Sequence, residues 1–99
     1  MRNLEHPPLQ LQATAGRPLD IVLDGAPGAG LLWQAPPAPA GCTLKAAGRA
    51  PGGAGEGAGM QQHFAFEAGR AGHWTLRFEL RRDWESSAQA VQPVQVTAT

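Results

Sequence analysis

The stretch His73–Arg82, which reads HWTLRFELRR, decides the fold class of this 99-residue chain. Large apolar side chains alternate in it with polar or charged ones, so every second residue points to the same side of an extended strand. One buried face and one wet face are typical of an antiparallel sheet. The apolar face consists of Trp74, Leu76, Phe78 and Leu80.

The same two-residue period recurs in shorter stretches along the chain. Helix signals are almost absent, because Gly or Pro interrupts nearly every window that could hold an apolar stripe at helical spacing. The alternating stretches are 9–13, 19–24, 63–67 and 94–98, and 31–33 adds a short apolar one. We expect their inward residues to form the core with the apolar face above, namely Leu9, Leu11, Leu19, Ile21, Leu23, Trp33, Phe64, Phe66, Val94 and Val96.

Turn-forming segments separate these stretches. Glycine or proline recurs in residues 16–18, 25–30, 35–39, 51–59 and 67–72, and proline cannot donate a hydrogen bond within a sheet. Several short strands punctuated in this way predict an all-β fold, an immunoglobulin-like antiparallel β-sandwich of about seven or eight strands. We expect residues 1–99 to form a single domain, in which residues 1–6 are a loose N-terminal tail.

Composition excludes several classes of function. Eight Lys+Arg balance eight Asp+Glu, which excludes the basic footprint of a nucleic-acid-binding protein. The single cysteine, Cys42, excludes an intramolecular disulfide and a cysteine-based zinc cage. No apolar stretch approaches the ~20 residues that span a membrane. No signal peptide is visible, so we expect a cytoplasmic protein or a mature periplasmic or secreted domain, and the Ala, Gly, Arg and Pro content is typical of a GC-rich bacterial genome.

Sites for catalysis are weakly supported. A thiol nucleophile at Cys42 needs a base, and His6, His63 and His73 are the histidines of the chain, but nothing nearby in sequence pairs them with it. A small buried apolar role is more typical of such a cysteine. Ser86-Ser87 lacks the Gly-x-Ser-x-Gly elbow of a hydrolase. We therefore expect no enzyme.

Metal and nucleotide sites are no better supported. His63 and His73 could be cross-strand neighbours on the solvent face, but no third ligand accompanies them. The glycines of 55–59 lack both the Gly-Lys-Ser/Thr of a phosphate loop and the strand–loop–helix context of a dinucleotide site. We therefore expect no cofactor.

Three loops are expected to gather at one end of such a sandwich. They are Gly25–Gly30, the glycine-rich run that ends at Gly59, and Arg82–Trp84. Bare glycine loops expose backbone groups and allow another chain to approach closely, although they can also be mere connectors. An exposed tryptophan beside an arginine is typical of a binding hot spot. This end is suited to docking into a narrow cleft.

The three loops resemble those of the chagasin family, which inhibits papain-like cysteine proteases. That family carries an Asn-Pro-Thr-Thr-Gly loop followed shortly by Trp, then Gly-x-Gly-Gly, then Arg-Pro-Trp or Arg-Pro-Phe. Here APGAGLLW occupies residues 26–33, GAGM occupies 57–60 and RDW occupies 82–84. Order, spacing and intervening strands agree over residues 16–98.

The resemblance implies a reversible, competitive protein inhibitor that acts as a monomer without catalysis or cofactor. Its first loop would approach the catalytic cysteine of a papain-like protease without reacting, flanked by the other two. Pro27 and Gly30, Gly57 and Gly59, and Arg82 and Trp84 match the family's motifs. The protease-binding residues would be Ala26, Pro27, Gly28, Ala29, Gly30, Gly57, Ala58, Gly59, Met60, Arg82, Asp83 and Trp84.

The chain departs from the family pattern in all three loops. Ala26 replaces Asn, Gly28-Ala29 replace Thr-Thr, Met60 replaces Gly and Asp83 replaces Pro. An alternative function is therefore a non-inhibitory immunoglobulin-like protein-binding module with degenerate inhibitory loops, which could take a protein or a peptide at a sheet edge.

Overall fold

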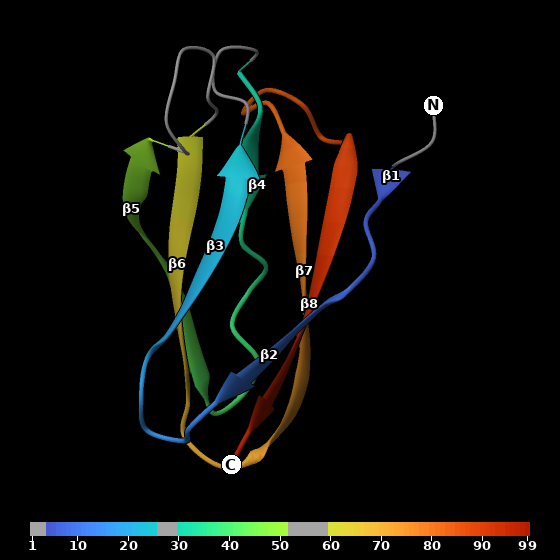
Figure 1. Cartoon of the computed structure of the whole chain (residues 1–99). Coiled ribbons are helices and arrows are strands. Elements are labelled where there is room, and N and C mark those ends of the chain that lie inside the picture. The colour runs from blue at the N-terminus through green and yellow to red at the C-terminus, as the bar shows by residue number, and fades with distance from the viewer. Residues whose placement is uncertain (1–3, 26–29, 52–59) are drawn as a thin grey trace.

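The computed structural model describes residues 4–25, 30–51 and 60–99. These residues contain no helix, so this part of the chain holds none that could cross a membrane. They form two β-sheets that face one another, which confirms the predicted all-β sandwich (Figure 1). The strands are β1 (Leu4–Glu5), β2 (Leu9–Ala13), β3 (Leu19–Gly25), β4 (Leu32–Gln34), β5 (Cys42–Pro51), β6 (Met60–Ala68), β7 (Gly72–Arg81) and β8 (Ala90–Ala98).

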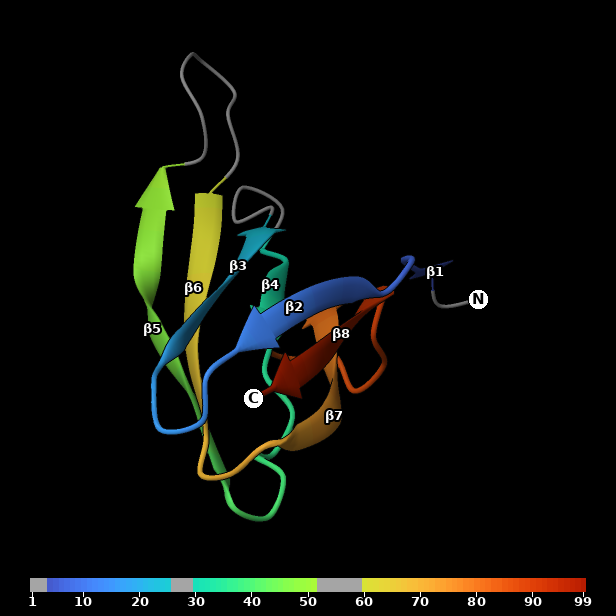
Figure 2. The ribbon, with the colours of Figure 1, turned by 60° about the horizontal axis from the view of Figure 1, so that its bottom comes forward.

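One sheet is built around β8 and has the order β1-β8-β7-β4, with β2 also pairing with β8. β7 and β8 are antiparallel, with Trp74 opposite Val96 and Leu80 opposite Ala90. β1 and β2 run parallel to β8, as Figure 2 shows for β2. Leu11 of β2 lies opposite Val96. The antiparallel β4 closes the other edge.

The parallel pairing corrects one part of the expected antiparallel β-sandwich, whose other strand pairs are antiparallel. β2 and β8 are the second and the last strand, and no hairpin connects them that would impose opposite directions. The alternation in Leu9–Ala13 predicts a strand with two unlike faces, but it looks the same whichever way the neighbouring strand runs.

The start of the chain corrects a second expectation. Residues 4–6 are not a loose tail, because Glu5 lies opposite Val91 and the His6 N–H donates to the Val91 carbonyl at 2.9 Å. The Arg77 guanidinium also donates to the Glu5 carboxylate at 2.9 Å. β1 and β2 supply hydrogen-bonding partners along the side of β8 that faces away from β7, where its backbone groups would otherwise be unpaired. Residues 1–3 lie outside the described residues.

The other sheet is antiparallel throughout, in the order β3-β6-β5. Ile21 of β3 lies opposite Phe64 of β6. The register between β5 and β6 shifts between Ala46 and Arg49, and β5 continues beyond that point. Gly48 has a φ of 112° at this irregularity, a conformation that favours glycine.

The core lies between the two sheets, where the rings of Phe64 and Phe78 meet with centroids 4.9 Å apart. Leu9 was predicted to be buried and is not, since 39% of it is exposed. It begins a strand with a neighbour on one side only. The buried predicted residues are Ile21, Leu23, Trp33, Phe64, Phe66, Leu76, Phe78, Val94 and Val96. Leu11, Leu19, Trp74 and Leu80 are partly buried against them, and the sequence missed Ala68, Ala88, Ala90, Val91 and Ala98.

The strand register brings the strand ends that border three connections to the same end of the sandwich, the top of Figure 1. Met60, at the start of β6, lies opposite both Gly25 and Pro51. Leu32, at the start of β4, lies opposite Arg81 at the end of β7. The connections β3–β4, β5–β6 and β7–β8 therefore start and finish side by side.

Candidate functional site

The described residues of the predicted protease-binding set all lie at this end of the sandwich. Gly30 directly precedes Leu31 and β4, Met60 opens β6, and residues 82–84 follow β7. The remaining predicted residues lie outside the described residues, namely Ala26, Pro27, Gly28, Ala29, Gly57, Ala58 and Gly59.

The structure brings the first and third motifs into contact at Gly30. A β-carbon built on this residue would lie 3.6 Å from Cη2 of Trp84 and 3.7 Å from Cγ of Arg82. Its φ of 76° lies in the left-handed region, which is unfavourable for residues with a β-carbon. Glycine thus lets the chain turn toward β4 directly beneath the indole of Trp84.

Trp84 is the most prominent apolar side chain on the described surface, with 78% of it exposed. Trp84 lies in the loop after β7, and in the sequence Arg82 ends the apolar alternation of that strand. Asp83 beside it is also exposed. An exposed indole on a firm base has the chemistry of an interface anchor.

The turn that carries Trp84 is held by Glu85, which the sequence analysis did not single out. The Glu85 N–H donates to the Arg82 carbonyl at 3.0 Å. In return, its carboxylate accepts the Arg82 N–H at 3.1 Å and the Arg82 guanidinium at 3.4 Å. Gln89 Nε2 donates to the same carboxylate at 3.3 Å, and Arg81 donates to the Glu85 carbonyl at 3.1 Å. The spacing Arg82-x-x-Glu85 is the only sequence signal for this arrangement.

These contacts keep the Glu85 carboxyl group ionised. The hydrogen bond from the Arg82 N–H, with smaller contributions from Gln89 and the Arg82 guanidinium, lowers the pKa of Glu85 below its ordinary value despite an opposing effect of burial. The carboxylate is the better acceptor for backbone N–H groups. The turn is therefore fastened at neutral and mildly acidic pH.

The base of the first loop is fastened through Trp33. Its indole Nε1 donates to the Asp24 carbonyl at 2.7 Å, so a side chain of β4 is hydrogen-bonded to the backbone of β3. Its own backbone is hydrogen-bonded to the side chain of Gln62, a buried glutamine on β6. The sequence analysis predicted Trp33 for the core but missed Gln62, although Gln62 shares the inward parity of Phe64 and Phe66.

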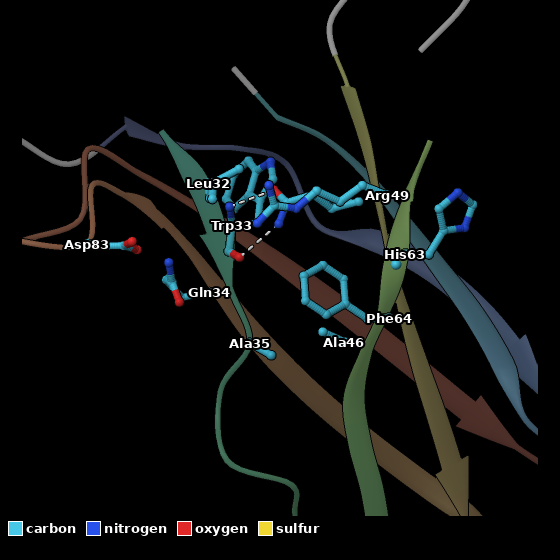
Figure 3. Close-up of a pocket in the computed structure, with 11 residues that line it drawn as sticks. Leu32, Trp33, Gln34, Ala35, Ala46, Arg49, His63, Phe64 and Asp83 are labelled. Carbon is cyan, nitrogen blue, oxygen red and sulfur yellow. Dashed lines mark hydrogen bonds between the residues drawn. The ribbon is translucent and has the colours of Figure 1, made fainter. Parts of the chain in front are cut away.

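A cleft of about 320 Å³ opens between β4 and β5 beside these contacts. In Figure 3, Leu32 and Gln34 of β4 lie on one side of it, and Phe64 and Arg49 approach from the other sheet. Asp83 also lines it, so the cleft adjoins the turn that carries Trp84.

The histidines are not neighbours, contrary to what alternation allowed. His63 of β6 lies 3.0 Å from the Asp20 carboxylate, whereas His73 of β7 lies 3.1 Å from the Thr97 hydroxyl in the other sheet. No group of three potential metal ligands occurs within residues 4–25, 30–51 and 60–99. Alternation assigns a side of a strand, but it cannot say which sheet the strand joins.

Comparisons with known proteins agree with this architecture. A model described as chagasin family peptidase inhibitor I42 matches residues 12–98. Among solved structures, the chain is similar to the cysteine protease inhibitor EhICP2 from Entamoeba histolytica, at 16% identity and a TM-score of 0.59, over 97% of this chain and 92% of that one. It is also similar to the solution structure of Amebosin, at 18% identity and a TM-score of 0.63, over 100% of both chains. Among curated proteins, none matches.

Proposed function

This chain belongs to the chagasin family of peptidase inhibitors, whose members are not enzymes, and we propose that it is a reversible, competitive inhibitor of papain-like cysteine proteases. The inhibitory surface would comprise residues 26–30, 57–60 and 82–84. A solved structure with a similar fold is itself titled a cysteine protease inhibitor, which supports this choice of target class.

The observation that carries the proposal is the exposed indole of Trp84 resting on Gly30. This contact joins the first and third of the family-like motifs at one end of the sandwich. Trp84 is 78% exposed and is therefore accessible to a partner. Glu85 and Trp33 hold the two segments from below through hydrogen bonds of 2.7–3.1 Å. A surface that is ordered before binding loses less entropy on association than one that must be ordered by its partner.

Inhibition by this surface would occur without a covalent step. Backbone groups and an aromatic side chain fill the protease cleft and exclude substrate, and no nucleophile of this chain is required. Arg82 beside Trp84 is held at the turn by Glu85, so its orientation is set before a partner binds. We propose that the protein acts as a monomer and needs no cofactor.

The direct test is steady-state inhibition of papain and of a cathepsin L-type protease by the purified chain. We expect KM to rise with inhibitor concentration while kcat stays constant, with an inhibition constant in the nanomolar to low micromolar range. A sample shown to be folded that has no effect at tens of micromolar would overturn the proposal. The protein-binding module without inhibitory loops would then be the better interpretation.

A pair of matched substitutions places the inhibitory surface. Gly28→Leu adds a bulky side chain to the first motif, and Ala71→Leu adds the same side chain to the exposed β6–β7 turn at the opposite end. We expect the first to weaken inhibition by at least tenfold and the second to leave it unchanged. Equal effects of the two substitutions would show that the protease does not bind the predicted end.

A further inference from the structure

Gln62 is a buried polar side chain that reaches from one sheet to the other. Only 7% of it is exposed, and it lies on the inward face of β6. Its Oε1 accepts the Trp33 N–H at 2.7 Å, and its Nε2 donates to the Trp33 carbonyl at 3.2 Å. Figure 3 shows both hydrogen bonds as dashed lines at Trp33. One carboxamide thus forms hydrogen bonds with both backbone polar groups of Trp33 in β4.

The position of β4 explains why a carboxamide is needed there. β4 is an edge strand whose paired neighbour is β7, and Trp33 lies opposite Leu80 in that pairing. Its N–H and carbonyl are nevertheless bonded to Gln62, so they face away from β7. Buried backbone groups must find partners, and a carboxamide offers one donor side and one acceptor side as a peptide group does. Gln62 takes the place of a missing neighbouring strand.

The same side chain also lies against the end of β3. A β-carbon built on Gly25 would lie only 2.9 Å from Oε1 of Gln62, so this glycine leaves room for the carboxamide. The Trp33 indole bonds to Asp24 next to it at 2.7 Å. Gln62 and Trp33 together therefore hold the last residues of β3 and the first residues of β4 at a defined separation.

We propose that Gln62 is a positioning residue of the inhibitory surface, because it sets the separation between the end of β3 and the start of β4 and so holds Gly30 against Trp84. The proposal rests on the proposed function for its effect on a protease. Gln62 itself lies inside the sandwich and acts through Trp33. Its contribution is to order the surface before the partner arrives, which strengthens binding without adding a contact.

A carboxyl group in place of the carboxamide tests this role, because its hydrogen-bonding pattern changes with pH. In Gln62→Glu, the neutral carboxyl group has one donor and one acceptor and reproduces both bonds to Trp33. The ionised form has acceptors only and is repelled by the Trp33 carbonyl. Burial raises the pKa of such a group. Charged or titratable residues nearby are Arg49, His63 and Asp83, which line the adjoining cleft, and Asp24, which follows the β3 residue opposite Gln62. Arg49 lies opposite Gln62 in β5, and its positive charge opposes the effect of burial on the pKa of the introduced carboxyl group.

The inhibition constant of Gln62→Glu is measured from about pH 5 to about pH 8 and divided by that of the unchanged chain at each pH, which removes the protease's own pH dependence. We expect a ratio near one at the acidic end and about tenfold weaker inhibition at the alkaline end. A tenfold change corresponds to the loss of one or two hydrogen bonds. Gln62→Met, of similar length without hydrogen-bonding groups, should be weaker by about the same factor at every pH.

Gln92→Glu is the matched control. Gln92 is also 7% exposed, but its Nε2 donates to the carbonyls of Pro7 and Pro93 and not to the backbone of β3 or β4. It should lower stability at every pH, and further as the carboxyl group ionises, while its inhibition ratio stays constant. If Gln92→Glu and Gln62→Glu change inhibition alike, general destabilisation explains both and the positioning role is overturned.

Amide hydrogen exchange separates the failure of this inference from failure of the proposed function. The Trp33 amide should be strongly protected in the unchanged chain, and in Gln62→Glu its protection should fall as pH rises, together with that of Gly30 and Leu31. This outcome supports the positioning role even if no protease is inhibited. Unchanged protection of all three amides in both Gln62→Glu and Gln62→Met overturns it. If Gln62→Glu does not fold, Gln62→Met alone decides by the same two measurements.

Discussion

Replacing Trp84 with alanine should damage protease binding far more than folding. A tryptophan side chain presents ~200 Å² of surface, so an exposed fraction of 78% leaves about 160 Å² open and about 40 Å² covered, part of it by Gly30. At ~25 cal/mol/Å², covering the open part in a complex is worth up to about 4 kcal/mol, whereas the covered part contributes about 1 kcal/mol to folding.

The two quantities are measured separately. We expect the inhibition constant of Trp84→Ala against papain or a cathepsin L-type protease to rise by about 30-fold to 1000-fold, which corresponds to about 2–4 kcal/mol. The free energy of unfolding, taken from urea titrations, should fall by only about 1 kcal/mol. The difference follows from the geometry, since most of the indole lies outside the folded chain.

Trp74→Phe provides the control, because Trp74 lies near the opposite end of the sandwich, where its ring meets Phe66 at 6.1 Å. It should reduce stability and leave the inhibition constant unchanged. The reasoning is refuted by a Trp84→Ala inhibition constant within about threefold of the unchanged chain. A loss of stability well above about 2 kcal/mol would also refute it, because the indole would then belong to the core.

Three further predictions concern the support of the site. Gly25→Ala places a β-carbon 2.9 Å from Oε1 of Gln62, so the carboxamide must shift, and urea titration should show a loss of about 1–3 kcal/mol in unfolding free energy. The lowered pKa of Glu85 means that its stabilising effect is complete above about pH 4.5 and is lost as pH falls through the lowered value. Glu85→Gln should therefore lose less stability than the unchanged chain between pH 7 and pH 3, as measured by urea midpoints; an identical loss would contradict the assigned contacts. Cys42→Ser should leave inhibition unchanged, since binding requires no thiol, and a large loss of inhibition would favour chemistry at that residue.

The alternating stretches made most of the fold predictable. In β3, β6 and β7 the side-chain period of two is carried by large residues such as Ile21, Phe64 and Phe78, and burial follows it residue by residue. The pattern is weaker where alanine occupies inward positions, as at Ala90 and Ala98, because a small side chain contrasts little with its neighbours. Those residues were missed for that reason.

The candidate site was less predictable, because its supports are contacts with the backbone. Trp84 could be placed in a loop from the break in alternation at Arg82. The role of Gln62 could not be found, since its partner is the backbone of Trp33, 29 positions away, and any residue type presents the same backbone groups. The Glu85 turn likewise depends on local geometry that a charge pattern does not specify.

The pairing of β2 with β8 has a consequence for how the chain folds. Gln10 pairs with Gln95, 85 positions away, and β8 is synthesised after every other described strand. The sheet β3-β6-β5 needs only residues 19–68. Its apolar face, with Ile21 and Phe66, can therefore form while the sheet that covers it still lacks its central strand, β8. Pairings between such distant residues slow folding to milliseconds or seconds, and a nascent chain at this stage is open to aggregation. We expect the yield of soluble protein to depend on how quickly Ala90–Ala98 clears the ribosome.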